Sequence, residues 1–118
     1  MLNQLTHTNQ IEWKLLNGEH IAGVWIKELR FDSESKRLQA KMLKFGPGAG
    51  FPKHMHPGGE ELFVLEGTVR IGKDFLSAGD YLYTAPNNIH DAYSEEGCIL
   101  LLITLEQVII LAENSANK

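Results

Sequence analysis

The sequence predicts an all-β domain that closes into a jelly roll or barrel. Three observations support this prediction: apolar residues occur in short runs, turn-forming residues separate these runs, and no stretch shows a convincing helical pattern. Short strands at frequent intervals, with glycine, proline and asparagine between them, are typical of β-sandwiches and barrels.

The predicted strands follow one another along nearly the whole chain. They cover 11–15, 23–31, 38–45, 61–65, 68–72, 81–84, 92–94 and 99–105, with a further candidate at 108–111. The turns between them include Asn17-Gly18, Gly46-Pro47-Gly48, Pro57-Gly58-Gly59, Ala78-Gly79-Asp80 and Pro86-Asn87-Asn88. Each turn contains residues that reach turn or left-handed backbone conformations at low cost.

Length and cysteine content indicate one domain without disulfides. The chain has 118 residues, a length typical of a single domain. We expect that domain to span 1–118, with its core at 11–111 and a loose N-terminus and C-terminal tail. Cys98 is the only cysteine, so neither an intrachain disulfide nor a zinc site with paired cysteines can form.

The charge pattern argues against two classes of partner. The formal net charge is −4, with 11 basic and 15 acidic residues and no basic cluster. Nucleic acids and anionic membranes attract clustered lysine and arginine, so we expect neither as a partner. The start of the chain lacks the character of a signal peptide, and the apolar run at 99–105 is too short to span a bilayer. We therefore expect a cytoplasmic protein.

Three of the five histidines form the main functional signal. His54 and His56 are separated by one residue, and side chains at i and i+2 of an extended strand point to the same face. The turn at 57–59 brings Glu60 back towards them, and His90 follows a second turn. Three imidazoles and one carboxylate suit divalent iron, manganese, nickel, copper or zinc. The alternative is a surface pair of histidines with an unrelated third one.

These predicted ligands also imply that metal binding depends on pH. Metal ligation needs neutral imidazoles, so we expect the metal to be lost as the pH falls towards the ordinary histidine pKa of about 6.5.

Two stretches resemble the two motifs of the cupin superfamily. Residues 48–67 read GAGFPKHMHPGGEELFVLEG and match G-x5-H-x-H-x3-E-x6-G at Gly48, His54, His56, Glu60 and Gly67. Residues 79–94 read GDYLYTAPNNIHDAYS and match G-x5-P-x-G-x2-H-x3-N at Gly79 and His90, with Ala85, Asn87 and Ser94 in place of proline, glycine and asparagine. The resemblance implies a single RmlC-like jelly-roll barrel with His54, His56, Glu60 and His90 as metal ligands. Asn87 is a tolerable substitute because asparagine accepts a positive φ.

Within the superfamily, the chain is similar to the cupin-like domain of ChrR-type anti-sigma factors. HPGGEELFVLEG, SEEGC, Trp13 and Gly23-Val24 carry this resemblance, which covers 13–105. Those proteins also have an N-terminal zinc domain that holds the sigma factor. We expect that domain to be absent, because one cysteine could not supply its ligands. The same branch is similar to acetylacetone-cleaving and dihydroxyacetophenone dioxygenases, in which three histidines typically hold iron.

Three functions follow as alternatives. The first is a metal-binding module that senses or binds a small molecule beside a divalent metal, with zinc or iron favoured and manganese or nickel also suitable. The second is an iron-dependent dioxygenase acting on a diketone or a phenolic ketone. The third, a metal-dependent isomerase or epimerase, needs a general base that only Glu61 or a tyrosine could supply.

Strand alternation assigns the residues around the predicted site. Leu62 and Val64 should point inwards with Glu60, as should Ala92 and Ser94 with His90. Phe63 and Leu65 should point outwards, and exposed apolar side chains often mark an interface, so we expect a homodimer. Near the site, we expect Met42 or Leu43 to form pocket walls, Tyr81 or Tyr83 to supply a hydroxyl to the pocket, and Glu61 to be either a partner of a ligand histidine or a solvated charge. Elsewhere, we expect Cys98 in the core and His7 and His20 at the surface. Trp13 and Trp25 should be packing residues.

Overall fold

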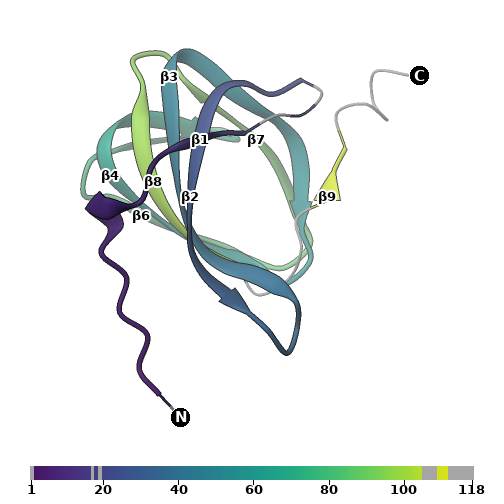
Figure 1. Cartoon of the computed structure of the whole chain (residues 1–118). Helices are drawn as coiled ribbons and strands as arrows, with labels where there is room; N and C mark the ends of the chain where they lie inside the picture. Colours follow the sequence, from purple (N-terminus) through teal and green to yellow (C-terminus); the bar gives the residue numbers. More distant parts are fainter. Residues whose placement is uncertain (1, 17, 19, 105–108, 112–118) are drawn as a thin grey trace.

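A computed structural model describes residues 2–16, 18, 20–104 and 109–111, and these residues form an almost entirely β structure (Figure 1). In chain order the elements are the 3-10 helix η1 (Thr8–Gln10) and the strands β1 (Lys14–Leu15), β2 (Ala22–Asp32), β3 (Arg37–His56), β4 (Glu60–Ile71), β5 (Asp74–Ser77), β6 (Tyr81–Thr84), β7 (Asn88–Ser94), β8 (Cys98–Thr104) and β9 (Ile109–Ile110). The predicted all-β fold is confirmed. No helix among the described residues is long and apolar enough to cross a membrane.

Most predicted strands are present, but several of their bounds differ. The predicted strands at 61–65 and 68–72 are one continuous strand, β4. Strand β5 was not predicted, because Phe75 and Leu76 form a very short apolar run between two turns. The predicted strand at 108–111 corresponds to β9, and its first residue lies outside the described part of the chain. The same is true of Asn17, of Leu105 and of the predicted tail from residue 113 onwards.

The long strand β3 joins the two layers of the barrel. Its first part pairs with β2 and β8, and its last part pairs with β7 and β9, all in antiparallel fashion. The predicted turn at Gly46-Pro47-Gly48 is wrong, because the chain stays extended there and only bends. Gly48 has φ +80, which glycine adopts at low cost, and it donates its N–H to the carbonyl of Glu95. Figure 1 shows the strands wrapped around a common interior.

Alternation along β4 and β8 builds the core. Leu62 and Val64 of β4 are buried, whereas Phe63 and Leu65 point outwards, as predicted. On β8 the inward residues begin with Cys98, which is a buried core residue as expected. Burial also raises the pKa of its thiol, which disfavours the reactive thiolate. Ala92 and Ser94 of β7 are buried on the same side of the barrel.

Two motif residues owe their identity to backbone geometry. Gly67 has φ +79, and a Cβ atom there would lie 2.1 Å from the carbonyl oxygen of Gly97. Only glycine therefore allows β4 to pass this close to the turn before β8. Asn87 has φ +69, which confirms that asparagine replaces the motif glycine at a left-handed position.

Candidate metal centre

The three predicted histidines come together at one end of the barrel. The register of β3 and β7 places His54 directly opposite His90, and His56 follows two residues later on the same face of β3. The three ring centroids lie 4.7 to 4.9 Å from one another. One nitrogen from each ring lies within 4.8 Å of the others, so the cluster could hold a metal ion.

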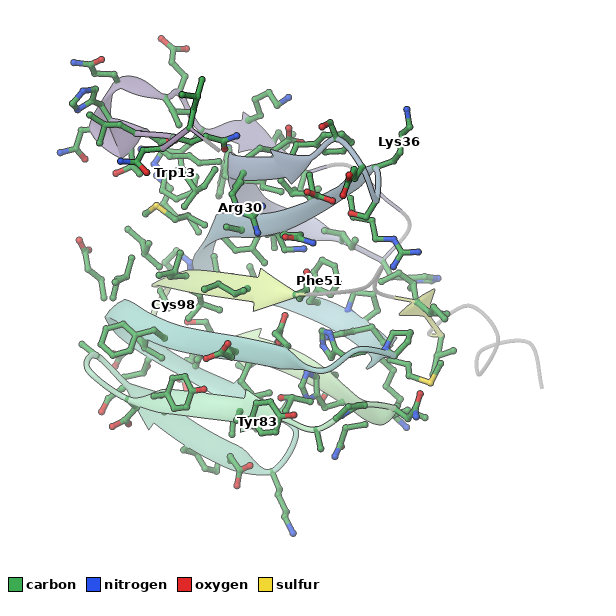
Figure 2. All side chains as sticks on the ribbon, turned by 90° about the horizontal axis from the view of Figure 1, so that it is seen from below. Trp13, Arg30, Lys36, Phe51, Tyr83 and Cys98 are labelled. Atoms are coloured by element: carbon green, nitrogen blue, oxygen red, sulfur yellow. The ribbon has the colours of Figure 1, made fainter. Side chains whose placement is uncertain are left out.

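Hydrogen bonding fixes which nitrogen of His54 is free. Its Nδ1 lies 2.6 Å from the carbonyl oxygen of Pro52, so Nδ1–H donates to that oxygen and Nε2 keeps its lone pair. Such a second partner orients a ligand histidine. Phe51 packs edge-on against the same ring, with 5.1 Å between centroids, and Figure 2 shows Phe51 between the two layers of the barrel.

The other two rings approach each other more closely. Nε2 of His56 lies 3.2 Å from Nε2 of His90. Two nitrogens that bind one cation at about 2.0–2.1 Å are separated by about 3.0–3.4 Å, so the spacing fits two ligands of a shared metal. Nδ1 of His56 is buried and has no hydrogen-bond partner among the described residues. The protein therefore orients His54 by a carbonyl group, and His56 chiefly by packing.

Glu60 lies beside this cluster. One of its carboxylate oxygens is 3.5 Å from Nε2 of His56, and the side chain is buried at the start of β4. Burial raises the pKa of Glu60 to about 7, and the positive charge of Lys41 opposes this shift in part. A cation among the histidines would favour the ionised carboxylate. Its role as a fourth ligand stays a prediction.

Burial also changes the proton affinity of the histidines. Desolvation lowers the pKa of His54 to about 4 and that of His56 to about 3, and it lowers the pKa of His90 as well. The rings of His54 and His56 are therefore neutral well below pH 6.5, as metal ligation requires, and the pKa of His90 is shifted in the same direction. The pH at which protons displace a metal moves below the value expected from an ordinary histidine.

A cavity of about 450 Å³ opens beside the histidines. Apolar side chains from several strands line much of it, including Leu43, Phe45 and Phe51 of β3, Leu62 of β4, and Leu100 and Leu102 of β8. Two of the predicted wall residues, Leu43 and Leu62, are among them, whereas Met42 and Val64 are not. The volume lies within the range of about 300–1,000 Å³ that is common for small-molecule sites.

Lys41, which is not among the residues predicted for the site, also lines this cavity. It lies on β3 at the alternation that places Leu43 and Phe45 inside the barrel. The sequence carried a signal for it: Lys41 shares the two-residue alternation of Leu43 and Phe45, which are inward apolar residues.

Other candidates lie outside the cavity. Tyr81 and Tyr83 are 57% and 58% exposed, and Tyr83 is labelled in Figure 2. The hydroxyl of Tyr81 donates to a carboxylate oxygen of Glu61 at 2.8 Å. Glu61 is thus a surface charge, and neither it nor these tyrosines reaches the histidines. The isomerase hypothesis loses the general bases on which it depended.

The remaining candidates also lie away from the site. His7 and His20 are exposed, as predicted. Trp13 and Trp25 flank the ammonium group of Lys44, with ring centroids 5.3 and 5.6 Å from Nζ. Both tryptophans are packing residues, as expected, and neither lines the cavity.

Comparison with known proteins agrees with this geometry. The model of the family described as ChrR Cupin-like domain matches residues 2–108. This chain belongs to that family. No curated protein matches its sequence.

Solved structures resemble this ChrR cupin-like domain closely in fold. An acetylacetone dioxygenase from Acinetobacter johnsonii is 14% identical, with a TM-score of 0.79 over 97% of this chain and 79% of that one. The polyketide cyclase RemF from Streptomyces resistomycificus is 15% identical, with a TM-score of 0.73 over 93% of this chain and 86% of that one. These two likenesses show the fold.

A third neighbour comes from the complex of Rhodobacter sphaeroides SigE with the anti-sigma ChrR. It is 29% identical, with a TM-score of 0.67 over 82% of this chain. The match covers 50% of that chain, so it concerns about half of the larger protein.

Proposed function

We propose that this domain binds a divalent metal through His54, His56, His90 and Glu60, and binds or senses a small molecule beside it. The observation that carries the proposal is the convergence of three imidazoles from two strands, with 3.2 Å between Nε2 of His56 and Nε2 of His90. Neutral rings, a carboxylate at 3.5 Å and an adjacent cavity all suit such a site.

Zinc or iron is the preferred metal, and manganese or nickel also suits this ligand set. When bound, such a cation supplies a Lewis acid that polarises an oxygen of a small ligand. The protein contributes the orientation of His54 through Pro52, and it contributes a largely apolar cavity beside the histidines. Sigma-factor binding is not carried over, because the ChrR match covers about half of that chain. A cytoplasmic location remains a prediction.

Removal of a ligand tests the metal site. We expect His56→Ala and His90→Ala to lower zinc affinity more than about 100-fold, because loss of a direct ligand should exceed the 10–100-fold typical of outer-shell changes. Glu60→Gln should lower it less, since three nitrogens remain. His20→Ala, at an exposed position, is the matched control. Metal titration with elemental analysis of protein purified without added metal measures both affinity and metal identity. Equal affinity in all four variants would contradict the site.

The second candidate is an iron-dependent dioxygenase. It is favoured by the fold similarity to an acetylacetone dioxygenase over 97% of this chain, together with a largely apolar cavity beside the histidines. A binding module predicts no oxygen uptake by the ferrous protein with acetylacetone or a phenolic ketone. Uptake that is lost in His90→Ala would favour the enzyme instead. An oxygen electrode makes this measurement, and His20→Ala again serves as the control.

We propose in addition that two copies of the domain pair through the outer face of β4, β6 and β8. Phe63 of β4 lies opposite Tyr81 of β6 on one side and opposite Leu101 of β8 on the other. Ile103 lies two residues after Leu101 on β8. Phe63, Tyr81 and Ile103 are each 38% exposed or more. Contiguous apolar surface of this kind marks interaction sites.

Light scattering tests the pairing. We expect a mass near twice the 13.2 kDa of one chain, and Phe63→Lys should shift it towards that of a single chain, because the lysine would place a charge in the buried interface. Lys73→Glu, a charge change in an exposed turn, is the control. The mass of one chain in the unaltered protein would contradict the proposal.

A further inference from the structure

The wall of the cavity at the start of β3 is cationic. Lys41 lines the cavity together with Lys36 and Arg37, and all three belong to one short segment. Among the described residues, the only carboxylate that lines the same cavity is that of Glu60. Three cationic side chains thus face one carboxylate before the charge of any metal is counted. Such a cavity attracts anions.

Lys41 is the cation that lies deepest in this arrangement. Lys41 lines the same cavity as His54, His56 and Glu60, and its positive charge lowers the pKa of each of these groups. In the described part of the chain, its ammonium group has no hydrogen bond and no carboxylate oxygen within 4.0 Å. The ion-pair contact of Glu60 is with His56 instead. A half-buried ammonium group without a partner within hydrogen-bonding distance is costly.

The surroundings of Lys41 define what could compensate for that cost. Lys41 lies opposite Leu102 on β8, and Leu102 lies opposite Leu62 on β4. On its other side Lys41 lies opposite Glu28 of β2, an exposed residue that does not line the cavity. Leu43, the next inward residue of β3, borders the same area. One positive charge therefore adjoins a continuous apolar patch. Burial lowers the pKa of Lys41, while the carboxylates of Glu60 and Glu28 oppose this change and support the charged form.

We propose that the cavity binds an amphipathic organic acid, whose carboxylate pairs with Lys41 and whose apolar body packs against Leu43, Leu62 and Leu102. This assignment names the ligand class of the proposed function, and it rests on that function for the position of the acid beside the metal. A neutral diketone would leave the ammonium group without a partner. The choice between an acid and a neutral ligand is therefore open to direct measurement.

Octanoate and 1-octanol are suitable probes, because they share an apolar chain and differ in charge. Their binding to the full chain is measured by isothermal titration calorimetry, both with zinc and after removal of metal. We expect octanoate to bind at least about tenfold more tightly than 1-octanol, the preference that one charge-assisted hydrogen bond provides. Lys41→Met should abolish this preference while keeping most of the apolar volume of the side chain.

Two further variants make the result specific. Lys41→Arg keeps the charge and should retain the preference for octanoate. Lys73→Met removes the same charge from an exposed turn and should leave the preference unchanged. Thermal unfolding of each variant establishes that it is folded before binding is compared.

The outcomes separate this inference from the metal site. Loss of the octanoate preference in Lys41→Met, with retention in Lys41→Arg and Lys73→Met, supports the inference. Equal binding of the two probes to the unaltered protein, or a preference that survives in Lys41→Met, overturns it. Zinc binding by the same samples is recorded separately. If zinc binds and the octanoate preference is absent, the metal site stands and the inference about Lys41 fails. If the preference depends on Lys41 but zinc does not bind, the metal site fails and the anion site stands.

Discussion

Antiparallel pairing between the end of β3 and β7 holds His54 opposite His90, and the rest of the site depends on this register. A slip of one residue would turn His90 towards the outside of the barrel, because successive side chains of a strand point to opposite faces. Two features fix the register. The ladder is irregular between Phe51 and His54, which realigns the histidines with β7, and Asn87 forms the left-handed turn that starts β7. The main-chain N–H of Asn87 donates to the carbonyl oxygen of His56 at 2.7 Å, which ties that turn to the end of β3.

The electrostatics of the interior follow from that placement. Three imidazoles in a buried cluster favour their neutral forms, and the buried carboxylate of Glu60 is costly when ionised unless a cation lies near it. A divalent metal would supply that cation among the histidines. Lys41 contributes a second positive charge to the lining of the same cavity, which also contains leucine side chains. In the two proposals, the histidines and Glu60 bind the metal, and Lys41 binds a carboxylate.

The sequence predicted the barrel and the placement of the histidines well, because both depend on local patterns. His54 and His56 share a face through the two-residue period of a strand, and motif spacing brings Glu60 and His90 to the same end of the barrel. The sequence was a poorer guide to the fold and the site where tertiary structure overrides a local signal. Gly46-Pro47-Gly48 reads as a turn, yet pairing on both sides keeps β3 extended there. Lys41 reads as an ordinary surface lysine until the curvature of the barrel places it beside Glu60. Glu61 of β4 and the tyrosines of β6 are near the site in sequence, but their side chains face solvent instead.

The convergence of three imidazoles on one cation is tested most directly by X-ray absorption spectroscopy of the zinc-loaded protein. Three imidazole nitrogens and one oxygen should surround the zinc at about 2.0–2.1 Å, and the spectrum of His90→Ala should contain one imidazole fewer. A zinc shell without imidazole scattering, or one that His90→Ala leaves unchanged, would show that the histidines do not share a metal.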